Sequence, residues 1–133
     1  MKESYSIYDL LEQIQKRPAM YVGSFELERI ILYLAGYRHA MMEQGVRDES
    51  TPDFSGFHEF VRDKFQFPGS SMGWPNLILA KTMGLNPQDV TWENYNQGVT
   101  PELHKEAVLE FFRLIDEYRC TEVNDPTETE TRI

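Results

Sequence analysis

The sequence predicts an all-α fold, a compact single-domain bundle of about five helices. Apolar residues recur at helical spacing in five segments, and capping residues, prolines or glycines mark the ends of those segments. No segment alternates convincingly between apolar and polar residues, as a strand would. A chain of 133 residues suits one domain. A domain of that size buries roughly two-thirds of its unfolded surface, so the chain can form a real core.

The first two expected helices flank a proline. The first runs from Ser6 to Lys16, with a capping serine and, three residues on, Asp9 as a weaker form of the capping box. Pro18 ends it. The second is the longest amphipathic segment, from about Ser24 to Gln44, with Ser24 as its N-cap. We expect it to be the central helix of the domain. The residues that follow the spacing of one helical face are Leu27, Ile30, Ile31, Leu34, Tyr37, Arg38 and Met41.

Three more helices are expected in the second half of the chain. One spans 55–67 and stops at Pro68; another begins at Trp74-Pro75, with proline at its first position, and ends at Gly84. The last has Thr100 as N-cap and runs to about Arg119. The residues expected to be buried on these helices are Phe57, Phe60, Val61, Phe65, Trp74, Leu77, Ile78, Leu103, Ala107, Phe111, Leu114, Ile115 and Tyr118.

Two segments carry no regular pattern. Residues 85–99 mix two aromatic residues with acids and amides, and their periodicity is broken. Residues 120–133 are rich in threonine and glutamate and have little to bury, so we expect a mobile tail. The expected organisation is therefore a helical domain over 1–119 and an acidic tail over 120–133.

The charge balance limits the possible partners. Thirteen basic and 22 acidic residues give a net charge of −9. Such a chain lacks the basic face that nucleic acids or anionic membranes require, so the expected partner is neutral or basic. One cysteine excludes an internal disulfide framework. We find no signal peptide pattern and no apolar run approaching the roughly 20 residues that span a bilayer, and we expect a cytoplasmic location.

Sequence motifs for catalysis are weak. The three histidines, His39, His58 and His104, fall on three different expected helices without a ligand partner at helical spacing. We expect no catalytic residues, no metal site and no cofactor. Arg17, just before Pro18, has two interpretations: it binds an anion, or it pairs with a carboxylate, for instance on the last helix.

The candidate binding residues lie in two polar segments. Asp48, Glu49 and Asp53 occupy the linker between the second and third helices, which forms either a solvated loop or an acidic edge facing a partner. The second segment carries Asp89, Trp92, Glu93 and Tyr95. Its acids would supply charge and its two aromatic residues would anchor a partner, because tryptophan and tyrosine dominate binding hot spots. The alternative is that Trp92 packs back on the core.

The order of several motifs resembles a family of small bacterial proteins. RPAMYVG is followed by an apolar helix containing Gly36-Tyr37, by Phe57 to Val61, and by Trp74 with an apolar run. The helix from Ala107 to Tyr118 closes the pattern, which covers about residues 7–119. The family is found beside polymorphic and contact-dependent growth inhibition toxins. The resemblance therefore implies an immunity protein without catalytic residues. Residues 85–99 are longer here than in the family pattern, which makes them a candidate for partner-specific recognition.

Three functional hypotheses follow. The first is a cytoplasmic immunity protein that covers the active site of a cognate toxin domain, which is expected to be basic and nuclease-like. The immunity protein itself is expected to contact neither nucleic acid nor membrane. The second is a helical adaptor that binds a partner helix in an apolar groove. The third is a small hydrolase that uses Arg17 and a histidine, for which a deep pocket converging on Arg17 and His39 would be expected.

Overall fold

The structure is a computed structural model that describes residues 6–17, 26–46, 54–68 and 72–123, with only the backbone of 121–123. Within these ranges the chain forms five α-helices, one short 3-10 helix and no strand, which confirms the all-α prediction. The elements are α1 (Ile7–Lys16), α3 (Leu27–Glu43), η1 (Phe54–Gly56), α4 (Phe57–Phe65), α5 (Trp74–Thr82) and α6 (Pro101–Val123).

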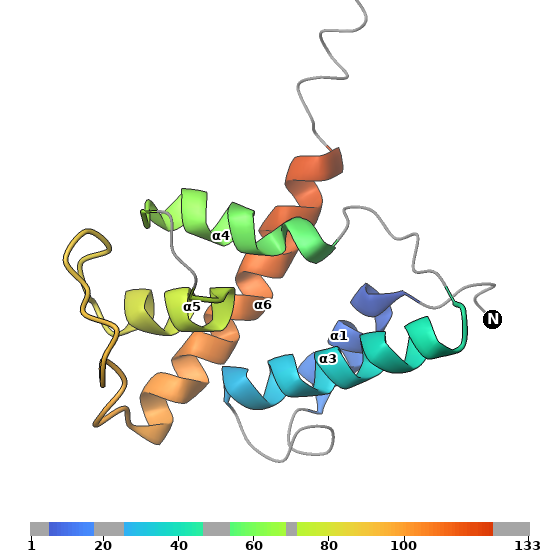
Figure 1. Cartoon of the computed structure of the whole chain (residues 1–133), viewed down its shortest axis with the longest axis horizontal. Coiled ribbons are helices and arrows are strands. Elements are labelled where there is room, and N and C mark those ends of the chain that lie inside the picture. Colours follow the sequence, from blue (N-terminus) through green and yellow to red (C-terminus); the bar gives the residue numbers. More distant parts are fainter. Residues whose placement is uncertain (1–5, 18–25, 47–53, 69–71, 124–133) are drawn as a thin grey trace, which may run out of the picture.

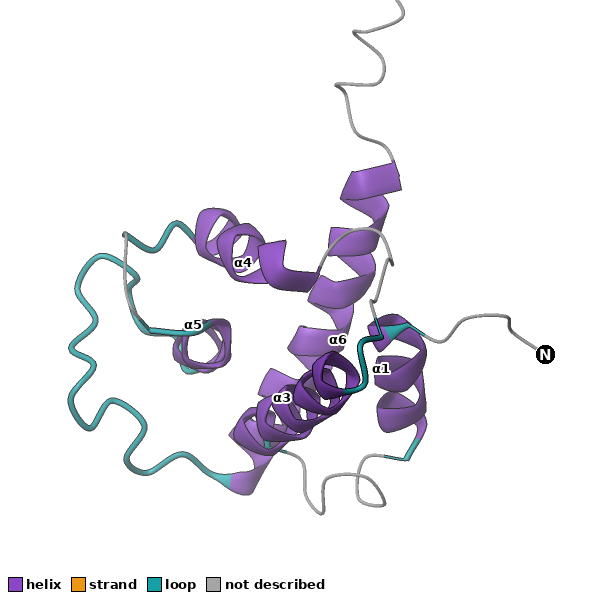
Figure 2. Cartoon of the chain, turned by 45° about the vertical axis from the view of Figure 1, so that its right-hand side comes forward, coloured by secondary structure: helices purple, strands orange, loops and turns teal. Residues whose placement is uncertain are grey.

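Helix α6 is the centre of the bundle. It contacts α3, α4 and α5, and α5 in turn contacts α3 and α4. Figure 1 shows α4 and α5 mainly on one side of α6, and α1 and α3 on the other. Helix α1 lies beside the C-terminal half of α6, where the Arg119 guanidinium stands 4.5 Å from the ring centroid of Tyr8. The loop between α5 and α6 extends outward beside α5 (Figure 2).

The expectation that the 24–44 segment forms the centre is wrong. In α3, Leu27, Ile30 and Leu34 are buried, and all three lie in the first half of the helix. Beyond them the helix is more open, and Met42 is 71% exposed. Periodicity reports that a helix has an apolar face, but not how much of that face a neighbouring element covers.

The core is built around stacked aromatic rings. Trp74 of α5 stacks on Phe111 of α6 with ring centroids 4.8 Å apart. Phe57 of α4 meets both rings edge-on, at 5.2 Å from Trp74 and 5.8 Å from Phe111. These three side chains join the three helices that pack most closely. No charged or polar residue is buried among the described residues, so their charges all lie at the surface.

Local signals place most helix starts correctly. Ser6 and Asp9 form a complete capping box on α1, stronger than the expected partial one. The Thr100 hydroxyl accepts the amide of Leu103 at the start of α6. Helix α3, however, begins at Leu27 with Glu26 in the N-cap position and no side-chain cap; the expected cap, Ser24, lies outside the described residues.

Three boundaries differ from the prediction. The 55–67 segment consists of η1 followed by α4, which ends at Phe65 because Gln66 takes a left-handed conformation (φ 62°). Pro75 is the second helical residue of α5, not the first. Helix α6 continues to Val123, one turn beyond the expected end.

Candidate functional site

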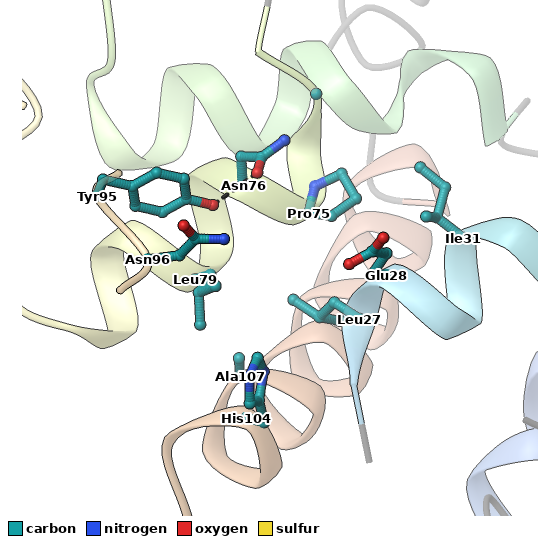
Figure 3. A pocket seen from close by; sticks show the side chains of 11 residues that line it. Leu27, Glu28, Ile31, Pro75, Asn76, Leu79, Tyr95, Asn96, His104 and Ala107 are labelled. Carbon is teal, nitrogen blue, oxygen red and sulfur yellow. Dashed lines mark hydrogen bonds between the residues drawn. The ribbon is translucent and has the colours of Figure 1, made fainter. Parts of the chain in front are cut away.

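A pocket of about 370 Å³ opens where the first turns of α3, α5 and α6 approach the loop 85–99. Figure 3 shows polar side chains on opposite sides of it and apolar side chains between them. The volume falls at the lower end of the range for small-ligand sites. The lining residues are Leu27, Glu28, Ile31, Gly73, Pro75, Asn76, Leu79, Tyr95, Asn96, His104 and Ala107.

The helix starts determine which side chains reach the pocket. Glu28 is the second residue of α3, where the positive end of the helix dipole favours a carboxylate. Gly73 is the N-cap of α5 and Pro75 is its second residue, a position that requires no amide hydrogen for the helix. The start of α6 at Pro101 places His104 one turn into the helix, facing the same space.

Tyr95 connects the loop to α5. Its hydroxyl donates a 2.6 Å hydrogen bond to Oδ1 of Asn76, drawn as a dashed line in Figure 3. Burial, and secondarily the negative charge of Glu28, raise the pKa of Tyr95 to about 12. Tyr95 therefore stays protonated at neutral pH and acts as a hydrogen-bond donor. A group shifted this far from neutrality is poorly suited to general acid or base catalysis.

Three other polar side chains of the pocket have no partner within the described part of the chain. The side chains of Glu28, Asn96 and His104 make no hydrogen bond or ion pair with another described residue. Figure 3 places the Glu28 carboxylate across the pocket from Tyr95 and Asn96. Oxygen and nitrogen atoms on both sides are thus available to a ligand. No group of three or more histidine, cysteine or acidic side chains among the described residues could hold a metal ion.

The loop 85–99 is irregular but anchored to the bundle. The side-chain amide of Gln88 donates to the backbone oxygen of Gln66 over 2.7 Å. The ring of Trp92 lies 5.9 Å from Phe67 and 5.0 Å from Tyr95, centroid to centroid. These contacts attach the loop to the end of α4 and to α5, and they replace the regular hydrogen bonds that the segment lacks.

The two aromatic residues of this loop are only partly exposed. Trp92 and Tyr95 are half-buried and pack against the core, and their role as anchors for a partner stays a prediction. Of the two alternatives for Trp92, packing on the core is the one observed. Asp89 and Glu93 are exposed, and Asp89 accepts a hydrogen bond from Asn86 at 3.0 Å. Their contribution to partner binding stays a prediction.

The other predicted binding residues lie outside the described part of the chain. Asp48, Glu49 and Asp53 all fall within residues 47–53. The acidic edge expected there stays a prediction.

Arg17 and His39, on which the pocket of a hydrolase was expected to converge, do not line this pocket. Arg17 is exposed at the C-cap of α1, and His39 is exposed on the second half of α3. Among the described residues, Arg17 pairs with no carboxylate, so the expected ion pair with the last helix is not found. The geometry around Arg17 and His39 does not support the hydrolase hypothesis.

Sequence reasoning missed most of the pocket. Glu28 is recognisable only as a favourable charge in a first turn, and His104 only as an isolated histidine. Asn76 and Asn96 carry no motif. The one available signal is positional: Glu28, Asn76 and His104 each lie two to four residues inside a helix start.

Comparisons of this chain with protein-family models, with curated protein sequences and with solved structures found no match. The resemblance to immunity proteins therefore stays a prediction from the sequence. Within the described residues, no helix combines the length and the apolar character needed to cross a bilayer.

Proposed function

We propose that this protein is an immunity protein that binds a basic, nuclease-like toxin domain in the cytoplasm and covers its active site. The observation that carries the proposal is the location of charge. The net charge is −9, and the described core contains no charged or polar residue. The acids of the described chain therefore lie at the surface, where they can meet a basic groove.

The mechanism requires surface complementarity rather than chemistry. A nuclease holds phosphates in a positively charged groove, and an acidic protein that enters this groove excludes the substrate. Opposite charges also accelerate encounter, with association rates up to roughly 10⁸ to 10⁹ per molar per second at low salt. An interface of standard size needs about 800 Å² on each partner.

Apolar anchors for such an interface are available on α3. The outer stripe of α3 begins at the pocket and follows helical spacing along the exposed side of the helix; it comprises Glu28, Leu32, Ala35, His39 and Met42. Leu32 is 65% exposed and Met42 is 71% exposed. Exposed apolar side chains aligned on one helix face can anchor a protein partner. The outer stripe would add apolar anchors to those predicted at Trp92 and Tyr95.

The outer stripe is an exposed helix face rather than the apolar groove expected of an adaptor, but its apolar side chains would serve an adaptor as well. An adaptor would use Leu32 and Met42 to bind a neutral partner, and its affinity would depend little on salt. An immunity protein facing a basic groove would lose affinity as salt screens the charges. Salt dependence therefore separates the two candidates.

The test is co-purification with the toxin domain encoded beside this chain, followed by calorimetry at two salt concentrations. We expect nanomolar binding that weakens as salt increases, together with loss of toxin activity in the complex. Replacing Leu32 and Met42 by serine should weaken binding about tenfold or more. Leu109→Ser is the matched control, since Leu109 is 50% exposed on α6.

Two outcomes would contradict the proposal. Absence of binding to the toxin domain would remove the immunity function. Binding that does not change with salt would favour the adaptor. Charge reversal at Asp48, Glu49, Asp53, Asp89 and Glu93 tests the two acidic segments separately from the outer stripe; unchanged affinity would exclude them from the interface.

A further inference from the structure

We propose that the pocket between α3, α5, α6 and the loop 85–99 binds the guanidinium side chain of an arginine, with Glu28 as its counter-charge. The inference rests on the proposed function for the origin of that arginine, the basic partner domain. It goes beyond that function by assigning one pocket and one side-chain chemistry.

The charge of the pocket selects a cation. Glu28 is an acidic side chain that has no ion-pair partner among the described residues. Its field already opposes ionisation of Tyr95, whose pKa is raised to about 12 by burial and by Glu28. A second anion in the same space would meet the same repulsion, whereas a cation would be attracted.

The positive ends of the neighbouring helix dipoles favour an anion in the pocket and so oppose the effect of Glu28. The first turns of α3, α5 and α6 border the pocket, and each carries about half a positive charge that falls off within one turn. Glu28 itself lies in the first turn of α3 and offsets part of this field. The pocket also extends along the second turns of these helices, through Ile31, Leu79 and Ala107, beyond the reach of the dipole ends. We therefore take Glu28 as the dominant charge.

The shape of the pocket fits a long side chain with a polar end. Leu27, Pro75 and Leu79 provide an apolar wall for a methylene stem. The polar groups lie farther apart, with Glu28 on one side and Tyr95 and Asn96 on the other (Figure 3). A planar guanidinium has five donors in a fixed fork and can reach acceptors on two sides at once. A lysine ammonium is a compact point charge and matches this arrangement less well.

The first experiment measures the site without any partner. The full chain is titrated with Nα-acetyl-arginine amide, with its lysine analogue and with its citrulline analogue, and the side-chain amide resonances of Asn76 and Asn96 are followed. We expect dissociation constants in the millimolar range, with the arginine compound binding most tightly, the lysine compound less tightly and the citrulline compound least tightly. Citrulline keeps the shape of arginine but has no charge, so equal binding of both would overturn the proposal.

The matched variants separate Glu28 from the overall charge. Glu28→Gln keeps the size of an exposed side chain, so the fold is expected to persist. It should weaken binding of the arginine compound by about fivefold, as expected for a partly solvated charge pair. Glu43→Gln removes an exposed charge from the other end of α3 and should leave binding unchanged. If both variants weaken binding equally, Glu28 acts only through the net charge of the protein, and the assignment is overturned.

The second experiment uses the toxin domain. Glu28→Gln should weaken the complex more than Glu43→Gln. If the toxin domain binds and Glu28→Gln has no effect, the pocket assignment fails and the proposed function stands. If the arginine compound binds in a Glu28-dependent manner but the toxin domain does not bind, the proposed function fails and the site stands.

Discussion

Tyr95 holds an irregular loop against α5 through one hydrogen bond to Asn76. Its ring also contacts Trp92, which packs on Phe67, so two aromatic side chains attach a segment that has no helix of its own. Side-chain packing of this kind lets a loop of fifteen residues keep a defined shape despite its few regular backbone bonds. The same contacts hold Tyr95 and Asn96 at the pocket.

Replacing Tyr95 by phenylalanine should destabilise the protein by about 1 kcal/mol at pH 8, the usual net value of a hydrogen bond. The pKa of Tyr95 is about 12 in the folded protein against an ordinary 10.0. Because the folded value is raised, the hydroxyl stabilises fully below pH 10.0, and this stability is lost as the pH rises through about 12. The advantage of the wild type should therefore shrink over that window.

The measurement is urea unfolding of both proteins at pH 8 and pH 11. Tyr33→Phe, on the exposed side of α3, is the control for removing a tyrosine hydroxyl elsewhere. A difference between wild type and Tyr95→Phe that stays constant from pH 8 to pH 11 would contradict the role assigned to the hydroxyl.

At the scale of elements, helix starts are determined by local bonds. In α1, the amide of Asp9 donates to the Ser6 hydroxyl at 3.2 Å, and the amide of Ser6 donates to the Asp9 carboxylate at 2.9 Å. Two backbone donors that the helix leaves without partners are thereby satisfied. All the atoms involved lie within four consecutive residues, which is why the sequence alone predicts this helix start.

Ser6→Ala should destabilise the protein by about 1 kcal/mol, because it removes the hydroxyl that accepts the amide of Asp9. Ser6→Gly should cost only a few tenths of that amount, since glycine is itself tolerated at the N-cap. The free energy of unfolding from denaturant titration distinguishes the two. Equal stability of the alanine variant and the wild type would mean that the capping box contributes nothing.

At the scale of the molecule, α6 organises the bundle because its aromatic residues meet those of α4 and α5. Phe111 is fully buried and contacts Trp74, Phe57 and Phe112. An ion pair between Lys64 of α4 and Glu117 of α6 adds a contact at the surface. The pocket exists only because the packing brings the first turns of α3, α5 and α6 toward one region.

Phe111→Ala should destabilise the protein by about 3 to 5 kcal/mol, since it removes a ring at the junction of three helices and leaves a cavity. The free energy of unfolding of a domain is roughly 5 to 15 kcal/mol, so the variant should be partly unfolded at elevated temperature. Thermal unfolding followed by circular dichroism measures the change. Phe60→Ala removes a half-buried ring from α4 and should cost less; the reverse order would contradict the central position of Phe111.

The positions of the helices along the sequence were largely predictable, but the packing of the helices against one another was not. The starts of α1 and α6 depend on Ser6 and Thr100, whose signals act within one turn. The candidate site was predicted less well, because Glu28, Asn76 and His104 come from three segments that only packing brings together. No periodic pattern contains that information.

The sequence by itself determined the all-α class, the approximate helix boundaries and the excess of negative charge. These follow from side-chain spacing and composition, which are properties of the chain before it folds. Only the tertiary structure decided that α6 rather than α3 is the centre, and that Trp92 and Tyr95 pack against the core. Burial depends on contacts between distant segments, so the same aromatic residue can be an anchor for a partner or for its own loop.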